Sequence, residues 1–119
     1  MQECEIIYRT ILLHMDLRYF GSNFENFINH CNSIINSNLV KHYISLNSSF
    51  PLIHNFENYF DLIVYNRFSK NKNFPNDKKI IDKLINLNKV CWLDFYHNKY
   101  ISSELKDHYK SYCPKYIVL

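Results

Sequence analysis

The chain has 119 residues and a formal net charge of +3, and 47% of its residues are hydrophobic and 17% aromatic. A chain of this length is expected to form one domain, residues 1–119, and its apolar content is too high for intrinsic disorder. No apolar run approaches the ~18 residues that a membrane span needs, and the N-terminal segment lacks the basic start of a secretory signal. The four scattered cysteines include no CxxC pair, so we expect free thiols in a reducing, cytoplasmic setting.

Residue usage is skewed toward amino acids that have AT-rich codons. Asn, Ile, Lys, Tyr and Phe number 16, 14, 11, 10 and 9, whereas alanine is absent and glycine occurs once. This bias indicates an AT-rich bacterium, phage, virus or parasite as the source of the gene. It also inflates the lysine count, so lysine number alone is weak evidence for a nucleic-acid partner.

Apolar spacing predicts helices along almost the whole chain, beginning with one over residues 4–20. Gly21 is placed to end that helix in a left-handed conformation. Ser22 and Glu25 then form a capping-box pattern at the start of a second helix over 24–35. The N-terminal third is therefore expected to contain two helices that meet at the glycine.

Shorter elements are predicted in the middle of the chain. Apolar residues between 39 and 44 predict one or two helical turns, and the Asn, Ser and Pro of 47–51 predict a loop. Helical spacing resumes over 52–63, although 62–65 (Leu-Ile-Val-Tyr) also fits a short strand. Pro75 then interrupts the chain before the next helix.

The last third is predicted to hold two further helices. Asn76 or Asp77 can cap a long helix whose apolar stripe runs over 80–95. Ser102 or Ser103 can cap the final helix. No internal repeat is evident, and no linker is long enough to divide the chain.

These elements predict a mostly all-α fold: a compact single-domain bundle of about five helices, with one or two short strands as the alternative. The apolar tail at 116–119 is expected to pack on the core or to lie as an edge strand. Because Asn is abundant and alanine is absent, intrinsic helix propensity is low, and burial must hold the helices.

Charge divides the chain into two unequal halves. Residues 1–64 carry three Lys/Arg against six Asp/Glu, whereas residues 65–119 carry eleven against five. The basic half opens with 67–79, RFSKNKNFPNDKK. Basic side chains contact phosphates, and aromatic rings stack on single-stranded bases. The sequence therefore predicts a nucleic-acid or partner-binding site at Arg67, Lys70, Lys72, Phe74, Lys78, Lys79 and Lys83.

Cysteines and histidines in the basic half offer an alternative metal site with the pattern C-x5-H-x10-H-x4-C. Its ligands would be Cys91, His97, His108 and Cys113, residue types that zinc accepts. The pattern lacks the close ligand pairs of structural zinc sites, and Cys91 falls on an apolar stripe. We therefore expect no metal and no cofactor. Cys113, which lies between Lys110 and Lys115, is the best candidate for a reactive thiolate.

Arg9 and His14 form an R-x4-H sequence in the first predicted helix. This six-residue stretch resembles the active-site motif of the small all-helical HEPN ribonucleases, in which an arginine and a histidine act on RNA. The resemblance implies a compact ribonuclease or toxin-like enzyme that uses these two residues. The chain contains no GxSxG, HExxH or glycine-rich phosphate loop.

Two functional classes follow from these observations. In the first, the chain is a small non-enzymatic binding protein whose basic half engages an acidic protein surface, a protein–RNA complex or single-stranded RNA. Its size, aromatic content and codon bias match inhibitors that phages and mobile elements direct at host defence, such as anti-CRISPR antagonists of a guide-RNA nuclease. The second class is the HEPN-like ribonuclease. The sequence favours the binding protein, predicts no membrane partner and gives no signal for oligomeric state.

Overall fold

The computed structural model describes residues 3–113 and shows a fold that is 70% helical. The described residues contain no strand, so the strand alternative at 62–65 is wrong and the prediction of a compact all-α domain is confirmed. No helix in this part of the chain is long and apolar enough to cross a membrane. The elements, with η for 3₁₀ segments, are α1 (Glu3–His14), η1 (Leu17–Asn23), α2 (Phe24–Ile34), α3 (Ser37–Leu46), η2 (Phe50–Leu52), η3 (Phe56–Leu62), α4 (Tyr65–Phe68), α5 (Lys78–Asn86), α6 (Trp92–His97), α7 (Ser103–His108) and η4 (Lys110–Tyr112).

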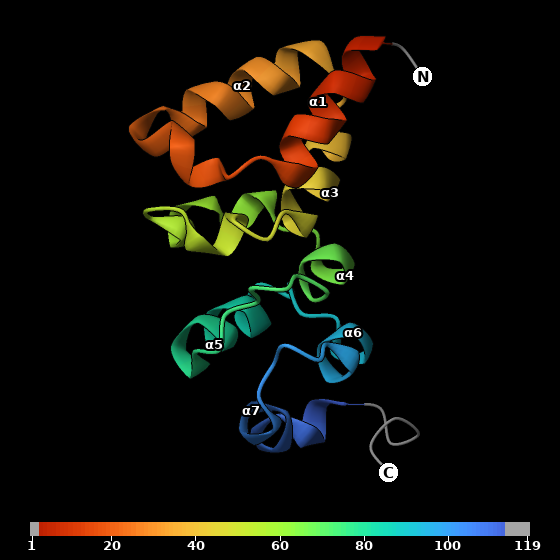
Figure 1. The fold of residues 1–119 in the computed structure, drawn as a ribbon. Coiled ribbons are helices and arrows are strands. Elements are labelled where there is room, and N and C mark those ends of the chain that lie inside the picture. Colours follow the sequence, from red (N-terminus) through yellow and green to blue (C-terminus); the bar gives the residue numbers. More distant parts are fainter. Residues whose placement is uncertain (1–2, 114–119) are drawn as a thin grey trace.

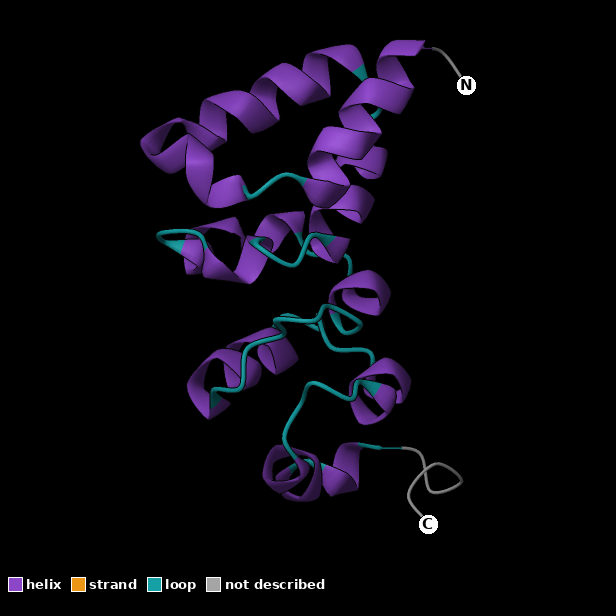
Figure 2. Cartoon of the chain, in the orientation of Figure 1, coloured by secondary structure: helices purple, strands orange, loops and turns teal. Residues whose placement is uncertain are grey.

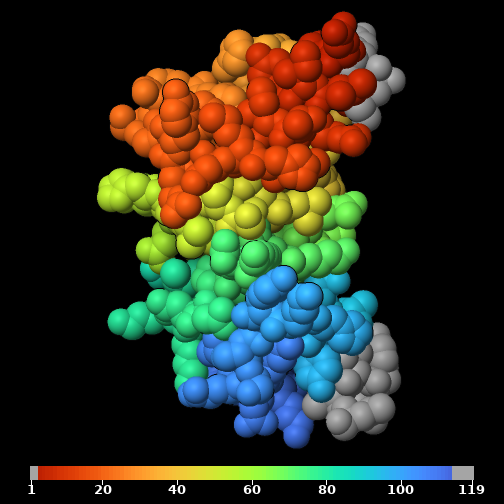
Figure 3. All heavy atoms as spheres, in the orientation of Figure 1, coloured from red at the N-terminus to blue at the C-terminus, as the bar shows by residue number. Residues whose placement is uncertain are grey.

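The helices are stacked in chain order along the long axis of the molecule. The layer of α1, α2 and α3 lies at one end, η3 and α4 lie in the middle, and α5, α6 and α7 lie toward the other end (Figure 1). Long loops pass between the short helices (Figure 2), and in the space-filling view successive parts of the chain form successive bands (Figure 3). The extents of 45 × 30 × 21 Å agree with this stacking. The radius of gyration is 15.0 Å, against about 13.5 Å for an average domain of this length.

A column of phenylalanine rings runs through these layers and forms the centre of the core. The ring centroids of Phe24 and Phe50 are 6.4 Å apart, and those of Phe50 and Phe68 are 6.0 Å apart. The column continues from Phe68 to Phe74 at 5.3 Å and from Phe74 to Phe95 at 5.7 Å. All five side chains are at most 2% exposed. Burial of these rings explains how a chain of weak helix formers holds its helices.

Three buried asparagines, Asn47, Asn71 and Asn98, form a hydrogen-bonded ladder beside the phenylalanine column. Each side-chain oxygen accepts a hydrogen bond of 2.9 Å from the amide two residues later. Each backbone carbonyl accepts from the amide three residues later, at 3.1–3.2 Å. Each side-chain nitrogen donates twice to carbonyl oxygens of the preceding layer, at 2.8–3.0 Å. The asparagine ladder thus fixes three turns in the same conformation and joins each turn to the layer before it.

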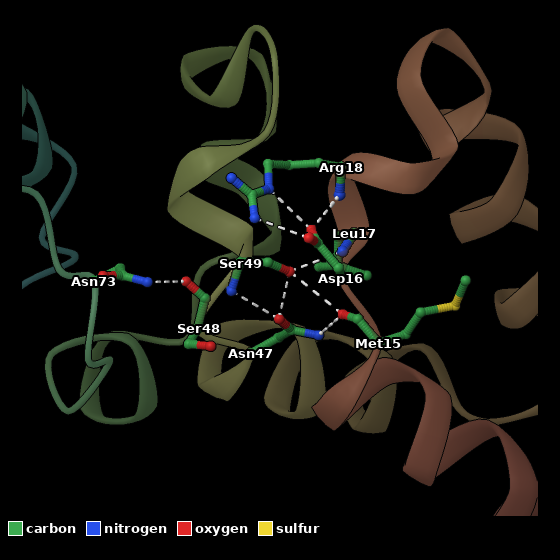
Figure 4. Close-up of polar contacts among 8 residues, drawn as sticks. All are labelled: Met15, Asp16, Leu17, Arg18, Asn47, Ser48, Ser49 and Asn73. Carbon is green, nitrogen blue, oxygen red and sulfur yellow. Dashed lines mark hydrogen bonds and ion pairs between the residues drawn. The ribbon is translucent and has the colours of Figure 1, made fainter.

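Figure 4 shows the first rung of the ladder, where the turn after α3 contacts the end of α1. The Asn47 side chain donates to the Met15 carbonyl at 2.9 Å and accepts from the Ser49 hydroxyl at 2.6 Å. The Ser49 hydroxyl in turn accepts from the Leu17 amide at 2.8 Å. These contacts satisfy backbone groups that a break in the helix leaves without partners. They explain why the chain leaves the helical path after α1.

The ladder reveals an internal repeat, so the prediction that the chain has none is wrong. The repeat is seen in the seven-residue segments 44–50, 68–74 and 95–101. In each segment the first and last residues are apolar and the middle residue is Asn. The asparagines are 24 and 27 residues apart. All six apolar residues are at most 3% exposed. Apolar spacing missed the repeat because only a few positions recur in each unit and their separation varies.

Two serines, one in each of the first two turns, form further hydrogen bonds between successive layers. Ser45 and Ser69 each lie two residues before a ladder asparagine, and both are fully buried. Their hydroxyls accept from the amides of Val64 and Cys91, each at 2.9 Å. Val64 and Cys91 immediately precede α4 and α6. The serines therefore satisfy amides at the start of the next layer's helices.

The predicted helix over 4–20 is shorter than expected, because α1 ends at His14. Asp16 begins a new 3₁₀ segment, and its side chain accepts from the Arg18 amide at 3.1 Å. Gly21 has the expected positive φ of 50°, but its ψ of −128° lies outside the left-handed helical region, and it forms a kink within η1 rather than the end of the first helix. The predicted capping box is also wrong, since α2 follows Asn23, which makes no side-chain cap.

The predicted long helix over 80–95 is two helices, α5 and α6. Asn88, between them, has a left-handed φ of 59°, which interrupts the helical path. The predicted helix over 52–63 is a pair of 3₁₀ segments rather than an α-helix. The expected caps are confirmed: Asp77 accepts from the second amide of α5 at 2.9 Å, and Ser102 accepts from the Leu105 amide of α7 at 3.2 Å. The tail at 116–119 lies outside the described residues.

Candidate functional site

The basic stretch 67–79 forms the second asparagine turn and the start of α5. Lys70 and Lys72 lie on either side of Asn71, and both lysines are exposed. Lys78 and Lys79 are exposed in the first turn of α5, where a positive charge opposes the helix dipole. The stretch is therefore a structured connection whose charged side chains face solvent.

Phe74 does not present its ring to solvent, which contradicts its predicted role in the binding site. Its side chain is 1% exposed and lies in the phenylalanine column between Phe68 and Phe95. The bond from its amide to the Asn71 carbonyl, at 3.1 Å, fixes it there. A ring held in this way cannot stack on a nucleic-acid base.

Two other predicted site residues already have partners elsewhere. The Lys83 ammonium pairs with the Glu57 carboxylate at 2.7 Å, on the exposed side of α5. The Arg67 guanidinium donates from Nε to Nδ1 of His42 at 3.3 Å, which directs it toward α3. The predicted residues therefore separate into several places on the molecule.

The ladder instead gathers a basic edge from two successive turns. We call this surface the turn edge and define it by the exposed residues Lys72, Lys99 and Tyr100. The ammonium groups of Lys72 and Lys99 lie 5.7 and 5.3 Å from the centroid of the Tyr100 ring. The Tyr100 side chain is 47% exposed. Lys70, on the other side of Asn71, pairs with Asp94 at 3.9 Å, so the positive charge of the turn edge comes from Lys72 and Lys99.

A cavity of about 430 Å³ opens next to the turn edge. Pro51, Leu52 and Pro75 supply apolar walls, and Lys72 and Tyr100 also line it. An exposed aromatic ring beside lysines and an apolar hollow is a combination that single-stranded nucleic acids use for stacking and phosphate contact.

The sequence interpretation missed Lys99 and Tyr100 and placed His97 in a metal site. The signal that would have found them is the recurrence of Asn with flanking lysines, K-N-K at 70–72 and N-K at 98–99. That recurrence places the flanking residues on one edge only when the turns are stacked. The aromatic partner of the lysines is therefore Tyr100 and not Phe74.

The alternative metal ligands are not brought together. No group of three or more His, Cys, Asp or Glu side chains within residues 3–113 is arranged to hold a metal ion. Cys113 is buried, whereas His97 and His108 are exposed. Burial also raises the pKa of the Cys91 and Cys113 thiols above the ordinary value. Cys113 is therefore not an activated thiolate, which corrects that expectation.

Arg9 and His14 do not form a convergent pair. Five residues of α-helix rotate a side chain by about 140° around the axis, so the two project from different sides of α1. His14 is exposed at the end of the helix, whereas Arg9 lines a cavity with His42 and Arg67.

No protein-family model, curated protein or solved structure matches this chain.

Proposed function

We propose that this chain is a non-enzymatic binding protein whose turn edge contacts RNA within a protein–RNA complex. The observation that carries the proposal is the Tyr100 ring, exposed and approached by Lys72 and Lys99 from two stacked turns. Lysines supply phosphate contacts, and an exposed ring stacks on any base. The turn edge therefore suits a flexible single strand better than a flat acidic protein surface.

Rigidity of the turn edge supports the same proposal. The turns that carry its lysines are held by Asn71 and Asn98, which are 1% and 7% exposed and fully hydrogen-bonded. A preorganised surface loses little conformational entropy on binding. The size and codon bias of the chain further support a role as an inhibitor from a phage or mobile element that blocks a nucleic-acid-guided nuclease, of the anti-CRISPR type.

The test uses fluorescence anisotropy with a short fluorescein-labelled oligouridine. The Lys72→Glu/Lys99→Glu variant should abolish binding, and Tyr100→Ala should weaken it about 5- to 100-fold, as loss of one stacked base does. The charge-matched control is Lys78→Glu/Lys79→Glu, which changes the first turn of α5 and leaves the turn edge intact. In the unchanged protein, log affinity should fall with log salt at a slope of about 0.7 per phosphate contacted.

Three results would contradict the proposal. Equal loss of affinity in the control would mean that net charge binds the RNA and that the turn edge has no special part. Cleavage of the oligonucleotide that disappears in His14→Ala would show an enzyme and would revive the ribonuclease. Absence of binding at low salt would remove RNA as the partner.

A further inference from the structure

A second cavity lies away from the turn edge, on the outward face of α3. Leu39, His42, Tyr43 and Leu46 share this face, because their spacing is i, i+3, i+4 and i+7. They line a cavity of about 410 Å³ together with Arg9 and Leu13 of α1 and Arg67 of α4. This volume is within the range of small-molecule sites. The opposite face of α3, with Val40 and Ile44, is fully buried in the core.

The polar lining of this cavity is cationic. Among the described residues 3–113, the lining includes Arg9, Arg67 and His42 and no Asp or Glu. The Arg67 Nε donates to His42 Nδ1 at 3.3 Å, which orients the guanidinium and leaves its terminal nitrogens as further donors. Guanidinium groups bind oxyanions through paired N–H donors. Tyr43 lies in the same lining.

The rest of the lining is apolar. Leu13, Leu39 and Leu46 contribute aliphatic side chains, and Leu46 is 38% exposed. An inorganic ion alone would leave this surface in contact with water. A ligand with both an anionic group and a hydrocarbon or aromatic body would cover both parts of the lining.

We propose that this cavity binds an organic phosphate monoester, with the phosphate on Arg67 and Arg9 and the apolar body on the three leucines. The paired N–H donors of Arg67, with Arg9 in the same lining, match the charge and the terminal oxygens of a phosphate monoester better than those of a single carboxylate. The inference is independent of the proposed function, because the turn edge shares no residue with this cavity.

The test is isothermal titration with 1-naphthyl phosphate as the probe. It should bind at least about tenfold more tightly than inorganic phosphate or 2-naphthol, because each of these offers only half of the required chemistry. Arg67→Gln should weaken binding of 1-naphthyl phosphate about tenfold or more, which is the usual effect of losing a charge-assisted hydrogen bond. Arg67→Lys should give an intermediate loss, because the charge remains and the paired donors do not.

Arg18→Gln is the matched control, because Arg18 is the third arginine of the chain and lies outside this cavity. It should leave the affinity unchanged. Equal affinity of 1-naphthyl phosphate for the native protein and for folded Arg67→Gln would overturn the proposal, as would equal affinities for the three probes. If Arg67→Gln does not fold, NMR shifts of the Leu39 and Leu46 methyl groups on titration of the native protein decide the matter, and unmoved shifts reject the site. Oligouridine binding should be unaffected by Arg67→Gln, so this site and the turn edge fail or succeed separately.

Discussion

The first asparagine turn and the two that follow it have the same backbone and different surfaces. In 44–50, 68–74 and 95–101 the asparagine makes the same set of hydrogen bonds, and the flanking apolar residues are buried. The exposed neighbours of the asparagine are Leu46 and Ser48 in the first turn, Lys70 and Lys72 in the second, and His97 and Lys99 in the third. Buried positions therefore set the fold of a turn, and the exposed positions are free to carry charge.

The comparison shows where the uneven charge of the two halves lies in the turns: at exposed positions beside the asparagine. The acidic half and the basic half contain the same kind of turn, so we expect Lys72 and Lys99 to contribute little to the stability of their turns. Asp16, before the first turn, accepts hydrogen bonds at the same two offsets as the asparagines, from the amides of Arg18 and Tyr19 at 3.1 Å. A carboxylate cannot donate to a preceding layer, so the ladder begins after it. Hydrogen bonds from Arg18 also lower the pKa of Asp16 below its ordinary value.

The largest effect on the free energy of unfolding should come from replacing Asn71, the middle asparagine of the ladder. Asn71→Ala removes two donated bonds and one accepted bond, and it leaves the buried carbonyls of Ser45 and Asn47 without these donors. We expect the free energy of unfolding to fall by about 2–4 kcal/mol, measured by urea denaturation monitored by circular dichroism. Asn71→Asp should be at least as damaging, because it places a carboxylate against two carbonyl oxygens.

Asn86→Ala is the control for this variant, since Asn86 is exposed in α5 and alanine is a better helix former. It should change the free energy of unfolding by about 0.5 kcal/mol or less. Equal effects of the two substitutions would show that the ladder does not hold the layers together.

A smaller change in stability should come from raising the pH, because ionisable groups are buried in the layers at the two ends of the molecule. Burial raises the pKa of the Cys31 thiol to about 11 from its ordinary 9.0. Burial and a hydrogen bond to Asp82 raise the pKa of Tyr109 well above its ordinary 10.0. Both groups bind their protons more tightly in the folded chain than in the unfolded chain. Their contribution to stability is therefore complete below pH 9 and is lost progressively as the pH rises through the folded values.

We accordingly expect the urea midpoint to fall as the pH rises from 9 to 11. Tyr109→Phe should lower the free energy of unfolding at pH 7 by about 1 kcal/mol, through loss of the bond to Asp82, and should flatten the alkaline decline. Cys31→Ala should flatten the part of the decline that begins at pH 9. A decline of the same size in the double variant would mean that other groups cause it.

The smallest effect on stability should come from converting the later turns to the surface of the first. Lys72→Ser/Lys99→Ser copies the serine at position 48 and alters only exposed side chains. We expect the free energy of unfolding to change by about 0.5 kcal/mol or less, while oligouridine affinity falls. In the reverse direction, Ser48→Lys should extend the turn edge and steepen the salt dependence by up to about 0.7. Loss of stability in the serine variant would show that the lysines support the turns.

Sequence reasoning succeeded where a signal is local. The caps at Asp77 and Ser102 are confirmed, because a side chain that accepts from an amide two or three residues later needs no distant partner. The predicted end of the first helix failed, because Asn47 and Ser49, far away in the chain, satisfy the backbone groups freed at 15–17. The prediction of the binding-site residues was wrong in part for the same reason. Phe74 and Tyr100 are both aromatic residues near lysines, and only the stacking of turns decides which ring is buried.

The sequence by itself determined the compact all-α class, the caps of α5 and α7, and the concentration of positive charge in the second half. These properties depend on composition, on apolar spacing and on contacts between near neighbours. The tertiary structure alone decided where helices break, which aromatic ring remains exposed and which cations share a surface. The physical reason is that the asparagine side chains bond to carbonyls more than twenty residues away, and the repeat that marks them has too few positions and too uneven a spacing for apolar periodicity to detect.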